Sequence, residues 1–156
     1  MIVSDSTILI TLINIDEFEL LESFVESIII TKEVYEEVSQ RVYAKNFIDA
    51  KIDESYIKIE NYTDLQLFYE INTILDKGES ASITLAIEKS LPLIIDEKKG
   101  RRFAKAQGIE VVGLIGILRY LYLEKKLSKK ESLEIIKKLN NSNFRIDKKL
   151  IEMILA

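Results

Sequence analysis

The chain has 156 residues, and its 47% hydrophobic and 31% charged residues are typical of a globular domain large enough to bury a core. It contains no cysteine and no histidine, which excludes disulfide frameworks, zinc–thiolate sites, cysteine nucleophiles and histidine-based triads. The net charge of −4 conceals a split, because residues 1–97 carry 7 basic and 20 acidic groups whereas residues 98–149 carry 15 basic and 5 acidic groups. The basic part favours a polyanionic partner, although Lys and Arg on helices also serve simply as a solvated surface.

Without histidine or cysteine, any metal site must be built from oxygen ligands, which favours Mg²⁺ or Mn²⁺. No apolar run reaches the roughly 18 residues of a membrane-spanning helix, and no basic region precedes the first apolar stretch. We therefore expect a cytoplasmic protein with no membrane association.

Short apolar runs alternate with helical patterns along the chain, which predicts an α/β fold with a mainly parallel sheet. The expected strands cover residues 1–6, 27–31, 56–60, 91–96 and 109–113, and the alternation of 56–60 is typical of an edge strand. The expected helices cover residues 8–15, 16–26, 32–41, 65–75, 79–90, 97–107, 114–126, 128–139 and 147–155. Residues 44–55 are poorly patterned and predict a short helix or a loop.

The organisation of the chain favours one domain over residues 1–156, with the helices of 128–156 as an appended part of it. There are no internal repeats, low-complexity tracts or long linkers. The helix expected to follow Ser128 has a capping-box pattern, because Glu131 stands three residues later. Asp76, Lys77 and Gly78 are expected to break the helix that precedes them.

Two of the expected strands end in an aspartate. Asp5 ends the first strand, and Asp96 ends the strand of residues 91–96, with Glu97 opening the next helix. Ligands of open parallel sheets bind beyond the carboxyl ends of the strands, so the two aspartates can share a site. The alternative is that Asp96 merely caps the helix that follows it, a position that aspartate favours.

Two further acids lie on helices. Glu37 is expected about 60° around its helix from the buried stripe that begins with Val34, which places it at the edge of the core. A surface pair with Arg41, one turn later, is the structural alternative. Glu79 lies in the first turn of its helix, where the macrodipole favours an acid.

Basic residues follow Asp96 closely. Lys98, Arg101 and Arg102 have the charge and the hydrogen-bond donors to hold the phosphates of a nucleic acid. Several carboxylates brought together by the fold could hold a hard cation, which can activate water and stabilise negative charge. Without a metal, four clustered carboxylates repel one another, so such a cluster is not expected for structural reasons alone.

Four segments between Ile2 and Arg119 resemble the PIN-domain nucleases, and in particular small stand-alone prokaryotic PIN-like proteins. They are VSDSTILITL, ITKEVYEEV, GESASITLAIE and LIIDEKKGRRFAKAQGIEVVGLIGIL, in this order. The resemblance implies a three-layer α/β/α fold, a Mg²⁺- or Mn²⁺-dependent ribonuclease acting on RNA, and a homodimeric toxin with an antitoxin partner.

The resemblance also assigns roles to individual residues. It implies that four acids are catalytic and bind metal, namely Asp5, Glu37, Glu79 and Asp96. Glu97 takes a further acidic position of the metal site, and Ser6 takes the place of a substrate-binding hydroxyl. The better-known toxins carry Asp where this chain has Glu79, whose extra methylene leaves open whether it contacts the metal directly or through water.

Two other functions compete with the nuclease. One is a PIN fold that has lost catalysis and serves as an RNA- or protein-binding regulatory module. The other is a phosphatase of the haloacid-dehalogenase type, which also begins with an aspartate after its first strand. That phosphatase needs a second aspartate two residues later, where this chain has Thr7, so the residues argue against it.

Overall fold

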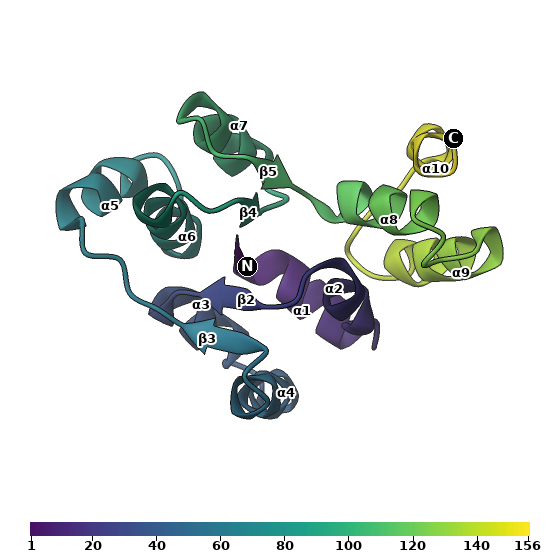
Figure 1. Ribbon diagram of the computed structural model, residues 1–156, viewed down its shortest axis with the longest axis horizontal. Coiled ribbons are helices and arrows are strands. Elements are labelled where there is room, and N and C mark those ends of the chain that lie inside the picture. The colour runs from purple at the N-terminus through teal and green to yellow at the C-terminus, as the bar shows by residue number, and fades with distance from the viewer.

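A five-stranded parallel sheet forms the centre of the computed structural model, which describes all of residues 1–156 (Figure 1). The strand order is β3-β2-β1-β4-β5, and every neighbouring pair is parallel. The strands are β1 (Ile2–Ser4), β2 (Ile28–Ile30), β3 (Ile57–Ile59), β4 (Leu93–Ile94) and β5 (Val111–Val112). All five expected strands are therefore present, and the predicted edge strand β3 does lie at an edge.

The helices cover both faces of this sheet. They are α1 (Ser6–Asn14), α2 (Glu19–Phe24), α3 (Lys32–Val38), α4 (Val42–Asp53), α5 (Leu65–Asn72), α6 (Lys77–Lys89), α7 (Lys98–Ala106), α8 (Leu114–Leu123), α9 (Lys129–Asn140) and α10 (Lys148–Ile154). None of them is both long enough and apolar enough to cross a membrane.

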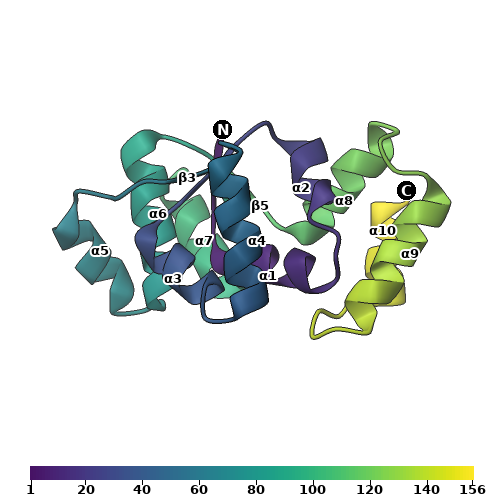
Figure 2. The ribbon, with the colours of Figure 1, turned by 90° about the horizontal axis from the view of Figure 1, so that it is seen from below.

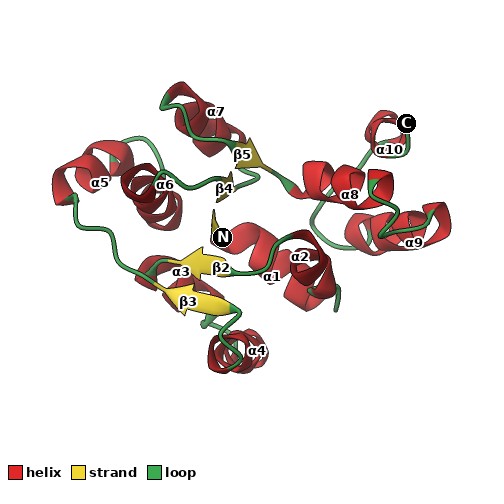
Figure 3. Ribbon diagram, in the orientation of Figure 1, coloured by secondary structure: helices red, strands yellow, loops and turns green.

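Alternation along the strands divides the core into two clusters and gives a three-layer α/β/α architecture. Side chains on one face of the sheet, such as Ile2 and Ile28, pack with α1–α4 and with α8–α10. Side chains on the other face, such as Val3 and Ile29, pack with α5–α7. Successive residues of a strand point to opposite faces, which is why neighbours in sequence belong to different clusters. Figure 3 shows the yellow strands between the red helices of the two outer layers.

Several local features differ from the sequence-based expectation. Residues 44–55 are largely helical, because α4 buries Ala44 and Ile48 on one face. Helix α2 begins only at Glu19, after Asp16 adopts a left-handed conformation with φ of 60°. Residues 76–78 do not simply break a helix, because Asp76 caps α6 and its next two residues form the first turn. The capping box at the start of α9 is confirmed.

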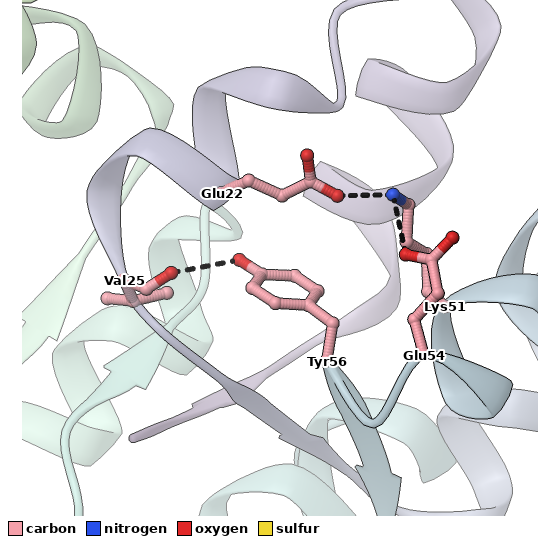
Figure 4. Close-up of polar contacts among 5 residues, drawn as sticks. All are labelled: Glu22, Val25, Lys51, Glu54 and Tyr56. Atoms are coloured by element: carbon pink, nitrogen blue, oxygen red, sulfur yellow. Dashed lines mark hydrogen bonds and ion pairs between the residues drawn. The ribbon is translucent and has the colours of Figure 1, made fainter.

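Polar contacts fix the edge of the sheet at the amino ends of its strands (Figure 4). The Tyr56 hydroxyl, just before β3, donates to the Val25 carbonyl at 3.2 Å. Lys51 of α4 pairs with Glu22 of α2 and, at 3.2 Å, with Glu54. Burial raises the pKa of Tyr56, and the nearby Glu22 carboxylate adds to the shift. These contacts tie α2, α4 and β3 together, away from the carboxyl ends of the strands.

The strand order reverses direction at one place, between β1 and β4. From β1 the chain builds outward to β2 and β3, and then crosses through α5 and α6 to place β4 on the other side of β1. The Asp5 amide donates to the Ile94 carbonyl at 2.9 Å, so the carboxyl ends of the two strands lie side by side. In open parallel sheets such a switch point is where ligands bind.

Candidate active site

Asp5 is the central residue at this switch point. It is the N-cap residue of α1, but its side chain caps no helix amide, and the residue is only 3% exposed. Its Oδ1 atom is buried without a hydrogen-bond partner. Burial raises the pKa of Asp5 to about 7, and the carboxylates of Asp76, Glu37 and Asp96 add to this effect, while the Ser6 amide opposes it.

Three carboxylates from separate elements converge on Gly78, in the first turn of α6. A Cβ atom on Gly78 would lie 2.7 Å from Glu37 Oε2, 3.7 Å from Asp5 Oδ1 and 3.8 Å from Asp76 Oδ1. The absence of a side chain at position 78 therefore gives these acids the space to approach one another. The close approach, and not an unusual backbone angle, is what requires glycine here.

Glu37 reaches the site from α3. The residue is exposed and lies at the surface of the site. Its position on the helix had suggested a place at the edge of the core. It forms no ion pair with Arg41, which removes the structural alternative for this residue. Its contact with the Gly78 position directs its carboxylate toward Asp5 and α6.

The start of α6 contributes two acids. Asp76 caps this helix, and its Oδ1 accepts from the Glu79 amide at 2.8 Å. Glu79 is only 7% exposed, and burial raises its pKa to about 8, with Asp76 and Asp5 adding to the shift. Asp76 was missed by the sequence analysis. The signal that could have revealed it is an aspartate three residues before Glu79, at an N-cap position that brings both acids into one turn.

Asp96 lies beside Asp5 but is also held by the protein. Its two carboxylate oxygens accept from the Leu114 amide at 3.2 and 3.3 Å, and Arg101 Nη1 lies 3.9 Å from Oδ1. Burial raises the pKa of Asp96, and the Leu114 amide and Arg101 oppose the shift. A Cβ atom on Gly113 would collide with both Asp96 and Arg101, so this glycine also makes room for a close approach.

The helix that Asp96 caps is not the one that follows it. Helix α7 is capped by Glu97, whose Oε2 accepts from the Gly100 amide at 2.7 Å. The Asp96 carboxylate instead meets the first amide of α8, 18 residues away in sequence. Glu97 is therefore occupied with its own helix, and its carboxylate adds to the raised pKa of Glu79.

The predicted substrate-binding residues take different positions. Arg101 is half-buried beside Asp96, whereas Lys98 and Arg102 are exposed on α7. Ser6 is 2% exposed in the first turn of α1, adjacent to Asp5. The basic residues thus border the acidic site on the α7 side without neutralising Asp5 or Glu79.

The side chains of the site suit a hard divalent cation by their chemistry. The donors are all carboxylate oxygens, and the unpartnered Asp5 Oδ1 is a buried acceptor that a cation would satisfy. No group of three or more acidic side chains is arranged as a ready-made metal site. The carboxylates surround Gly78 and flank Asp5, so holding one ion requires side-chain adjustments of Glu37 and Asp76, the two exposed members.

The fold and the site define a class: a three-layer α/β/α protein with a cluster of acids at the topological switch point of its parallel sheet. The chain matches the family model DUF3368, described as a PIN domain, over residues 1–156 and therefore belongs to the PIN-domain family. PIN domains are generally nucleases, and PIN nucleases generally use divalent metal ions. A search of curated proteins gives no match to this chain.

Proposed function

We propose that this protein is a Mg²⁺- or Mn²⁺-dependent endoribonuclease that hydrolyses phosphodiester bonds of RNA. The observation that carries the proposal is Asp5, whose buried Oδ1 has no partner although carboxylates from α3 and α6 surround it. Burying an unpaired carboxylate costs stability, so a cation or a proton has to balance it. A purely structural role gives no reason for placing further acids around the same atom.

The acidic and the basic residues have different parts in the proposed mechanism. Asp5, Glu37, Glu79 and Asp96 would hold the metal, and Asp76 joins them from the cap of α6. When bound, the ion supplies a water of lowered pKa and stabilises the charge that develops on the phosphate. Arg101 and the exposed Lys98 and Arg102 of α7 border the acids and would hold the phosphates of the RNA on either side of the cleaved bond.

Cleavage of end-labelled single-stranded RNA tests this function. We expect fragments in the presence of Mn²⁺ or Mg²⁺ and none in the presence of a chelator. Single-stranded DNA of the same sequence should be a poorer substrate. Binding of RNA without cleavage at any metal concentration would instead support the regulatory module, the alternative function of this fold.

We further propose that the protein acts as the toxin of a toxin–antitoxin pair and forms a homodimer. Leu65 and Tyr69, one turn apart on α5, and the nearby Ile74 are each more than half exposed, which supports a protein partner. A short reading frame for a small partner beside the gene, and its co-purification with this chain, test the antitoxin. Light scattering of the purified protein tests the dimer.

Gly78→Ala is expected to separate activity from stability. Alanine forms helices better than glycine by roughly 1 kcal/mol, so the free energy of unfolding should stay unchanged or rise. The new methyl group would displace the Glu37 carboxylate, which lies 2.7 Å from its position, and RNA cleavage should fall at least tenfold. Gly108→Ala is not a suitable control because of its positive φ. Gly116→Ala, in α8 and away from the acids, is the control for activity, and its stability is measured as well because its Cβ atom would lie 3.0 Å from Val112 Cγ2. Full activity of Gly78→Ala would show that Glu37 need not reach Asp5.

Arg102→Ala is expected to reduce the salt dependence of RNA binding. Each lost phosphate contact lowers the slope of log affinity against log salt by roughly 0.7 for a single strand. Arg102 is preferable to Arg101 for this test, because Arg101 also lies beside Asp96. Lys130→Ala is the control, since Lys130 is an exposed basic residue of α9, which lies at the right-hand end of the molecule in Figure 2, whereas α7 lies nearer the middle. Equal slopes for both variants would mean that Arg102 is only part of a solvated surface.

A further inference from the structure

A cavity of about 390 Å³ lies between α1 and the loop that joins α9 to α10. Its volume falls within the range of small-molecule binding sites. Thr7, Thr11 and Asn14 line one side and share one face of α1, because they follow a helical spacing. Asn143 and Phe144 of the loop line the other side.

The lining of this cavity is uncharged and mixed, because Ile10 and Phe144 supply apolar surface beside hydroxyl and amide side chains. The side chains of Thr7, Thr11, Asn14 and Asn143 form no hydrogen bond within the protein, and each can donate and accept. Phe144 adds the only aromatic ring of the lining. An uncharged lining with an aromatic ring, an aliphatic side chain, and hydroxyl and amide groups suits a nucleobase better than a phosphate or a metal ion.

The loop that carries Phe144 is held in place by its own hydrogen bonds. Asn140 donates to the Ile146 carbonyl at 3.0 Å and accepts from the Ile146 amide at 2.7 Å. The Ser142 hydroxyl donates to the Leu139 carbonyl at 2.6 Å and accepts from the Phe144 amide at 3.2 Å. The ring also packs against the larger core cluster, so it is positioned before any ligand arrives.

The cavity and the acidic site share one edge of the molecule. Thr7 is two residues from Asp5 in the first turn of α1. In Figure 2, the chain runs downward from the label N toward α1, and the α9–α10 loop lies at the bottom of the picture, right of centre, on the side where the strands end. Arg145, Lys148 and Lys149 follow Phe144 in the sequence and are exposed, so they add positive charge for a phosphate backbone beside the loop that lines the cavity.

We propose that this cavity is a base-binding subsite for RNA, which places one nucleobase of the strand beside the cleaved phosphodiester. Phe144 stacks on the face of the base, and Thr11 and Asn14 bond to its edge. The subsite rests on the proposed ribonuclease function, because the RNA strand bound for cleavage supplies the base that enters the cavity. It also provides a source of sequence preference that the acidic site lacks.

Binding of RNA to the Asp5→Asn protein, which should not cleave it, tests the subsite. Single-stranded RNAs that carry the fluorescent base 2-aminopurine at successive positions are titrated with this protein. We expect quenching at one position, where the base stacks on Phe144, and loss of that quenching in Phe144→Leu. Affinity should fall roughly 5- to 150-fold, the range for the loss of one stacked base. Phe47→Leu is the matched control, a half-buried ring that packs on the same core cluster but lies on α4.

Kinetics of the otherwise unchanged protein separate the subsite from the nuclease. Phe144→Leu should raise KM with little change in kcat, and Asn14→Ala, an exposed change that leaves the core intact, should do the same to a smaller extent. Cleavage by the parent with an unchanged KM in both variants would overturn the subsite alone. Position-specific quenching that depends on Phe144, in a protein that never cleaves, would overturn the nuclease and retain the subsite.

Discussion

The Asp5→Asn variant is expected to lose RNA cleavage by roughly two to three orders of magnitude or more while remaining folded. Asparagine has nearly the same shape and can still occupy the end of β1. It lacks the negative charge that the proposed metal site requires, and Asp5 is the residue on which the carboxylates of α3 and α6 converge. The rate of cleavage under single-turnover conditions is the measurement, because it reports chemistry without product release.

Asp53→Asn is the matched control for this substitution. Asp53 is exposed at the end of α4, and it forms no ion pair or side-chain hydrogen bond. Its asparagine variant should cleave RNA at the parental rate. Cleavage by a well-folded Asp5→Asn protein at that same rate would remove Asp5 from the mechanism and with it the central observation of the proposal.

The metal-free protein is expected to become less stable as the pH rises from about 4 to about 8. Burial raises the pKa of Asp5 from 3.8 to about 7 and that of Glu79 from 4.5 to about 8. Between these limits the folded protein binds more protons than the unfolded chain. Stability is therefore greatest below the pKa that each group has in the unfolded chain, and it is lost as the pH rises through the pKa of the same group in the folded protein. For Asp5 alone the loss is on the order of 4 kcal/mol.

Urea unfolding with a chelator present, at pH values across this window, measures the effect. Asp5→Asn should remove the loss of stability that is due to Asp5. The free energy of unfolding of the variant should therefore fall less steeply with pH and exceed that of the parent at pH 8. Asp53→Asn should follow the parent. A parental stability that rises through this window would contradict the buried, partnerless state of Asp5.

A divalent metal ion should restore the stability that the protein loses at high pH. An ion that binds only the folded protein should stabilise it by ~2.7 kcal/mol at a hundredfold excess over its dissociation constant. Asp96→Asn should lose most of this gain with little change in the metal-free protein, because asparagine can still accept from the Leu114 amide. Thermal melts of both proteins, with chelator and with Mn²⁺, provide the measurement. Equal shifts for the two would exclude Asp96 from the metal site.

Much of the fold was predictable from local patterns. Each strand is a short apolar run, and β3 shows the alternation of an edge strand. The start of α9 was predictable, because its capping box of Ser128 and Glu131 depends on residues only three positions apart. The placement of Asp5 and Asp96 at strand ends was predictable for the same reason, since it requires only that each strand be recognised. Helix α4 could not be predicted with its full length, because its hydrophobic pattern is weak. Only the tertiary structure buries Ala44 and Ile48 on one face of this helix.

The tertiary structure alone decided which side chains meet. Parallel strands are joined by long crossovers, so no local pattern states that β4 lies beside β1, and only that pairing brings Asp96 next to Asp5. Asp76 looked like part of a helix break, and it joined the site because α6 begins there, beside Glu37. Glu97 had the sequence position of a ligand but caps α7, whereas Asp96 caps the distant α8. A carboxylate contacts whichever amides and charges the fold brings within a few ångströms, and sequence spacing does not contain that distance.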